Sequence, residues 1–71
     1  MKLSYFSETD TLYVELASGA ASAAQEFSDG VVGDFDADGR LLGLEIEHAS
    51  TRIDVTRLET VGLPIGQLLA A

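Results

Sequence analysis

The sequence contains no cysteine, one histidine and only four basic residues, Lys2, Arg40, Arg52 and Arg57. Without cysteine the chain can form neither a disulfide nor a thiolate metal site, and one histidine excludes a histidine-rich metal centre. Twelve acidic residues face the four bases, for a formal net charge of -8 at pH 7. Nucleic acid and anionic membrane surfaces are bound by clustered lysine and arginine, so this charge balance disfavours both as partners.

The sequence also lacks the patterns of export and membrane insertion. No segment combines a charged start, an apolar core and a cleavage site. No apolar run approaches the roughly 20 residues that span a bilayer. Together with the absence of cysteine, these features predict a cytoplasmic protein.

The length of 71 residues predicts a single domain over residues 1–71. A domain of this size buries only about 60% of the surface of its unfolded chain, so a lone monomer is marginally stable. We therefore expect a protein partner or self-association, with a homodimer favoured. The acidic composition fits a basic protein partner.

Alternating apolar and polar residues predict a β-hairpin at the start of the chain. Its strands are Lys2–Phe6 and Thr11–Leu16, joined by the polar turn Ser7–Asp10. Tyr5 and Tyr13 fall on these two adjacent strands. We interpret them as a packing pair rather than as residues that stack on a ligand.

A second hairpin is predicted at the centre, with strands Val31–Asp36 and Arg40–His48. Before it, the small residues of Ala17–Ala24 read as a loop, Gln25–Phe27 as a short strand, and Ser28–Gly30 as a turn. The sequence leaves the order of the strands in the sheet open.

The end of the chain has a helix signal followed by an apolar tail. Thr56 and Glu59 fit a capping box, which predicts a helix over Arg57–Val61 with Gly62 as its C-terminal cap. The tail, Leu63–Leu69, is expected to fold onto the sheet or to face another chain. The predicted fold is α+β: a small antiparallel sheet of two β-hairpins (four to five strands), with a short C-terminal helix packed on one face.

The stretch DFDADGRLLGLE, from Asp34 to Glu45, matches the calcium loop of an EF-hand. Acids stand at the first, third and fifth places (Asp34, Asp36 and Asp38), followed by Gly39 and a closing Glu45. An EF-hand requires a helix on each side, and both flanks here are strand-like. We therefore favour a plain hairpin turn, in which Asp tolerates the turn geometry and Gly supplies a positive φ.

No catalytic, metal-binding or cofactor-binding residue is predicted, and no enzymatic activity. His48 is the only histidine and lies at a strand end. Glu45 and Glu47 share one side of a strand and read as its solvent face. A chain this short also leaves little room for a pocket of roughly 300 Å³ or more.

The chain contains several short segments that are individually unspecific but whose order and spacing are distinctive together. They are Tyr5, Glu8, Asp10, Leu12–Val14, Ser28–Val31, Asp36–Ile46 and Ala49–Ser50. With them the chain resembles, from about Lys2 to Arg52, a small prokaryotic family catalogued as domain of unknown function 2283. The resemblance implies a small antiparallel β-rich domain with no established activity. Similar proteins encoded beside small toxin-like proteins imply an antitoxin-like role.

These observations favour an uncharacterised protein-interaction module, an antitoxin-like partner of a basic protein. Two alternatives remain open at this point. One is a self-associating structural domain without ligand. The other, less favoured, is a calcium-responsive module that uses the Asp34–Glu45 loop.

Overall fold

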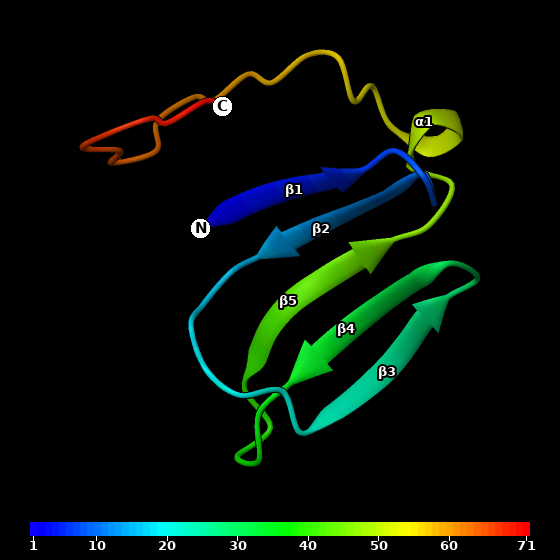
Figure 1. The fold of residues 1–71 in the computed structure, drawn as a ribbon. Helices are drawn as coiled ribbons and strands as arrows, with labels where there is room; N and C mark the ends of the chain where they lie inside the picture. Colours follow the sequence, from blue (N-terminus) through cyan, green and yellow to red (C-terminus); the bar gives the residue numbers. More distant parts are fainter.

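The computed structural model describes residues 1–71, and its centre is one five-stranded antiparallel sheet (Figure 1). The elements are β1 (Lys2–Phe6), β2 (Thr11–Glu15), β3 (Ala23–Ser28), β4 (Val31–Phe35), β5 (Leu41–Ile46) and α1 (Ala49–Arg52). Their order across the sheet is β1-β2-β5-β4-β3. The last strand of the chain, β5, therefore lies in the middle, and β1 and β3 are the two edges.

β1, β2 and β5 form where polar and apolar residues alternate, as predicted. β1 pairs antiparallel with β2, and β4 pairs antiparallel with β5. The expected short strand at Gln25–Phe27 is the middle of β3, which adds a fifth strand beside β4. β2 also pairs with β5, and this pairing joins the first hairpin to the rest of the sheet.

The predicted helix over Arg57–Val61 is wrong, because no residue of that range is helical. The only helix is α1, a single turn directly after β5. Thr56 does not cap a helix, because its amide and its hydroxyl both donate to the Asp54 carboxylate, the amide at 3.0 Å. Glu59 pairs with the Arg57 guanidinium at 2.9 Å instead of capping. Helices this short are unstable without packing. No helix of the chain is long and apolar enough to cross a membrane.

The interpretation of Tyr5 and Tyr13 as a packing pair is also wrong. In the register of β1 and β2, Tyr5 lies opposite Leu12, whereas Tyr13 lies opposite Ser4. Residues directly opposite share a face, and successive residues of a strand alternate between faces. The two rings therefore point to opposite sides of the sheet.

The sheet has almost no enclosed core. Only five residues are buried, namely Gly30, Gly33, Leu42, Gly43 and Ala49. Leu42, the one large side chain among them, lies beneath Gly19 of the loop between β2 and β3. No second layer covers the sheet.

The C-terminal arm, residues 53–71, has no regular structure. Figure 1 shows it leaving α1 and running beyond the β1 edge of the sheet. Its large apolar side chains are 37–84% exposed: Ile53, Val55, Leu58, Val61, Leu63, Ile65, Leu68 and Leu69.

Candidate interaction faces of the sheet

The strand register divides the side chains of the sheet between two faces of different chemistry. We call the first the apolar face: Leu3, Tyr5, Leu12, Val14, Ala23, Gln25, Phe27, Val31, Gly33, Phe35, Leu44 and Ile46. We call the second the acidic face: Lys2, Ser4, Phe6, Thr11, Tyr13, Glu15, Ala24, Glu26, Val32, Asp34, Gly43 and Glu45. The apolar face contains no charged residue.

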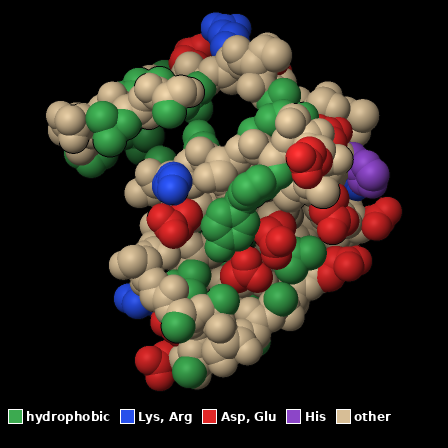
Figure 2. All heavy atoms as spheres, in the orientation of Figure 1, with side chains coloured by type: hydrophobic (Ala, Val, Ile, Leu, Met, Phe, Trp, Pro, Cys, Tyr) green, Lys and Arg blue, Asp and Glu red, His purple; other side chains and the backbone are tan.

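The acidic face is centred on Gly43 of β5. In register, Gly43 lies between Glu15 of β2 and Asp34 of β4. The ring of Tyr13 lies over it, so that a Cβ at Gly43 would come within 2.8 Å of Tyr13 Cζ. Glu45 stands directly opposite Tyr13. Figure 2 shows acidic side chains gathered around apolar and aromatic ones on this side of the molecule.

These carboxylates have no cationic partner within the chain. The two ion pairs of the protein, Arg40 with Asp36 and Arg57 with Glu59, lie elsewhere. Partial burial raises the pKa of Glu45, and the nearby carboxylates raise it further. Burial also raises the pKa of Tyr13, again with a contribution from neighbouring carboxylates. The acidic face therefore concentrates negative charge around Gly43, with Lys2 opposite Glu15 as its one basic residue and no ion pair between them.

An open hollow of about 540 Å³ adjoins this centre. Its lining residues are Phe6, Thr9, Thr11, Tyr13, Glu45, Glu47 and His48. The chain length predicted little room for a pocket of roughly 300 Å³ or more, and the volume of this hollow exceeds that figure. The hollow is open to solvent and has charged and hydroxyl-bearing residues in its lining beside Phe6 and Tyr13, unlike the enclosed apolar pockets that hold small molecules.

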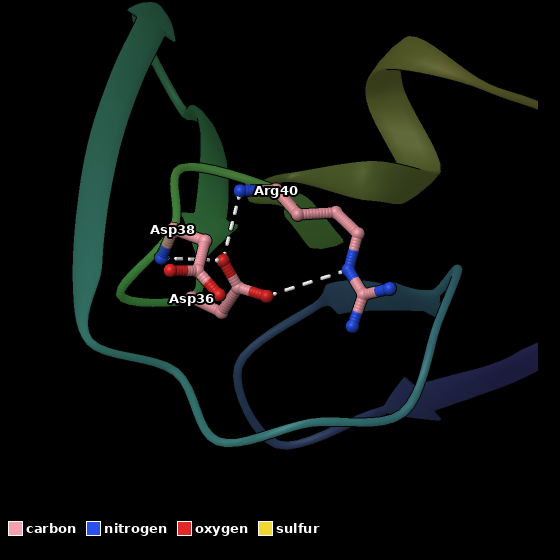
Figure 3. A network of polar contacts seen from close by, with 3 residues as sticks. All are labelled: Asp36, Asp38 and Arg40. Carbon is pink, nitrogen blue, oxygen red and sulfur yellow. Dashed lines mark hydrogen bonds and ion pairs between the residues drawn. The ribbon is translucent and has the colours of Figure 1, made fainter.

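The acidic turn between β4 and β5 is held by Asp36 (Figure 3). Asp36 Oδ1 accepts the amide hydrogens of Asp38 and Arg40, each at 2.9 Å, and Oδ2 pairs with Arg40 Nε at 3.3 Å. The Arg40 amide is the main cause that lowers the Asp36 pKa. Gly39 adopts the φ of 82° that completes the turn. The plain hairpin turn accounts for these residues.

The EF-hand geometry does not form around this turn. The flanks are β4 and β5 rather than helices. Asp34 belongs to the acidic face, whereas Asp36 is engaged in the turn. No group of three or more His, Cys, Asp or Glu side chains is placed to hold a metal ion.

A polar network joins the first turn to α1. Asp10 has a φ of 52°, and its carboxylate accepts three hydrogen bonds: from Tyr5 Oη at 2.7 Å, from the Ser50 amide at 3.0 Å, and from Ser50 Oγ at 2.7 Å. The bonds from Ser50, then the bond from Tyr5, are the main causes that lower the Asp10 pKa. Residue spacing alone could not reveal a contact between residues 10 and 50. The only signal in the sequence was that Tyr5, Asp10 and Ser50 all belong to the segments that carry the family resemblance.

The remaining residues considered from the sequence are at the surface. Glu45 lies on the acidic face but is half-buried rather than solvent-exposed, whereas Glu47 follows the end of β5 and is exposed. His48 is exposed and precedes α1 with φ 53°.

The fold and its faces define a small, acidic, β-rich domain built on a single-layer sheet. The chain belongs to the family described as "Protein of unknown function (DUF2283)", whose model matches residues 2–50 of the 71. The match confirms the resemblance seen in the sequence. It includes all five strands and the Asp10–Ser50 contact, and the C-terminal arm lies outside it. No curated protein and no solved structure matches the chain.

Proposed function

We propose that the chain is a non-enzymatic protein-interaction module that binds a basic protein through its acidic face. The observation that carries the proposal is the unpaired carboxylate group of this face. Glu15, Asp34 and Glu45 surround the Tyr13 ring, and none of the three forms an ion pair within the chain, although Lys2 lies opposite Glu15 in the strand register.

The arrangement suits a cationic side chain from a partner. A lysine or arginine over the Tyr13 ring would gain a cation–π contact and charge-assisted hydrogen bonds to the carboxylates. Burial first, and then repulsion from the carboxylates of Asp34 and Glu47, raises the pKa of Glu45 in the free chain. A bound cation relieves that repulsion, so the same feature that weakens the free fold favours the complex.

An antitoxin-like role fits this binding mode. In this proposal the module neutralises a small basic protein, in the cytoplasm, by covering the cationic surface that the basic protein uses. Charge complementarity also speeds the encounter and disfavours acidic competitors. The family resemblance supports the role through the toxin-like neighbours of similar proteins.

The test measures binding to a short arginine-rich peptide and, in parallel, to any small basic protein whose gene adjoins that of this chain. Isothermal titration calorimetry at low and high salt compares the wild type with the triple variant Glu15→Gln/Asp34→Asn/Glu45→Gln. We expect the variant to bind at least about 10-fold more weakly, with a flatter salt dependence.

The matched control removes the same three charges away from the face, as Glu8→Gln/Asp38→Asn/Glu59→Gln. None of these three residues lies on a strand. The control should bind almost as tightly as the wild type. Equal weakening in both triple variants, or no binding of either probe by the wild type, would refute the proposal.

A further inference from the structure

The chain exposes more surface than a compact monomer of its size. Its accessible surface is 5524 Å², whereas a monomer of 7.5 kDa typically exposes about 4,200 Å². The radius of gyration is 13.0 Å, against about 11 Å for a compact chain of this length. The excess of roughly 1,300 Å² is larger than the about 800 Å² that each partner buries in a standard interface.

Much of the large apolar surface outside the arm lies on the apolar face. Leu3, Tyr5 and Phe27 are 44%, 45% and 49% exposed. The Phe27 ring belongs to this face because it lies over Gly33, where a Cβ would come within 2.6 Å of Phe27 Cζ. It also packs edge-to-face on Phe35, with 6.1 Å between ring centroids. An apolar sheet face normally packs against a second layer, and this chain supplies none.

Charge decides what can cover the face. Two molecules of net charge -8 repel each other unless they meet where the charge is absent. The strands place no ionisable acid or base on the apolar face except the Tyr5 hydroxyl, which donates a hydrogen bond to the Asp10 carboxylate in the turn at the edge of this face. The strand carboxylates Glu15, Glu26, Asp34 and Glu45 all point to the other side. Two copies can therefore meet through their apolar faces with their acidic faces turned outward.

We propose that a second copy of this chain covers the apolar face, so that two sheets pack face to face as a β-sandwich. Stacked sheets lie about 10 Å apart, with side chains of both inner faces interdigitating. The dimer supplies the core that the single chain lacks. It goes beyond the proposed binding of a basic protein, and it would present two acidic faces on opposite sides.

The test compares two exposed phenylalanines on opposite faces and opposite edges. Phe27 of β3 is 49% exposed on the apolar face, and Phe6 of β1 is 54% exposed on the acidic face. Size-exclusion chromatography with light scattering, over a range of concentrations, should show a dimer for the wild type and for Phe6→Lys. Phe27→Lys should weaken the dimer at least about 10-fold, because it places a charge in the apolar interface.

Leu3→Lys tests the same face from the other edge, and circular dichroism checks that each variant keeps its sheet. Because Phe27 also packs on Phe35, the Phe27→Lys substitution can unfold the chain. In that case the oligomeric states of Leu3→Lys and of the wild type test the proposal. The melting temperature of the wild type should rise with protein concentration, since association stabilises the folded state.

A wild type that stays monomeric with a concentration-independent melting temperature would overturn the proposal. Retention of the dimer by folded Leu3→Lys and Phe27→Lys would also overturn it, in favour of edge-to-edge pairing of strands. Loss of the dimer in Phe6→Lys as much as in the other two would place the interface on the acidic face instead.

Discussion

On each face of the sheet an aromatic ring lies over a glycine of a central strand. Tyr13 covers Gly43 on the acidic face, and Phe27 covers Gly33 on the apolar face. Glycine weakens a strand interior because it has no side chain to pack. The outer end of the ring, Tyr13 Oη and Cζ or Phe27 Cζ and Cε2, fills the space above the glycine and restores that packing.

Replacing Gly43 tests this contact at the level of one methyl group. A Cβ there would lie 2.8 Å from Tyr13 Cζ and 3.0 Å from the Val14 carbonyl oxygen, and the second atom is backbone. We expect Gly43→Ala to lower the free energy of unfolding by about 1–3 kcal/mol. Urea denaturation at a fixed protein concentration measures it. Gly66→Ala is the matched control, because open space surrounds Gly66 and its change should be neutral.

Glu45 predicts a pH-dependent stability of the opposite sign to that of most acids. Its folded pKa is raised above 4.5, chiefly by burial and then by Asp34 and Glu47. The folded chain therefore binds the proton more tightly than the unfolded chain, and stability is lost as the pH rises from 4.5 through the folded pKa. Glu45→Gln removes that loss.

We accordingly expect Glu45→Gln to melt at a higher temperature than the wild type at about pH 7, with the difference vanishing at about pH 4. Thermal unfolding followed by circular dichroism at both values checks this. Glu8→Gln removes the same charge in the turn between β1 and β2 and should lack the pH-dependent gain. A destabilised Glu45→Gln at neutral pH would show that the carboxylate makes a favourable contact.

At the scale of elements, α1 is held to the sheet mainly by Asp10. Its carbonyl accepts the Ala49 amide at 2.9 Å, and its carboxylate accepts both polar hydrogens of Ser50. A helix of four residues has no stability of its own. The turn between β1 and β2 therefore determines where the chain goes after β5.

Asp10→Ala should release α1, since it removes the carboxylate and places alanine at a positive φ. We expect faster hydrogen exchange at the Ser50 amide and a melting temperature lower by several degrees. Asp10→Asn should be milder, because asparagine tolerates this φ and keeps one acceptor oxygen. The Asp10 pKa is lowered from 3.8, so its stabilisation is present above 3.8 and is lost as the pH falls through the folded value. An Asp10→Ala variant with unchanged exchange at Ser50 would contradict this role.

At the scale of the whole molecule, local patterns gave the strands and failed where distant groups decide. Alternation predicted β1 without error and β5 to within two residues at each end. It could not give the strand order, because the pairing of β2 with β5 joins residues about 30 apart. It also could not place Tyr5 and Tyr13, whose faces depend on register. The predicted capping box of Thr56 and Glu59 does not form, because Thr56 bonds to Asp54 and Glu59 pairs with Arg57.

The C-terminal arm gives the last prediction, since it follows the part of the chain that the family model matches. No hydrogen bond or ion pair joins residues 54–71 to the sheet. All five strands and the Asp10–Ser50 contact lie before it. A chain ending at Ile53 should therefore keep its β-sheet circular dichroism and the slow hydrogen exchange of β5, the central strand. A chain ending at Glu47, which lacks α1 and Ser50, is the comparison and should melt at a clearly lower temperature. If the chain ending at Ile53 unfolds, the apolar side chains of the arm are part of the core, and the sheet depends on them rather than on its own pairing and the α1 contact.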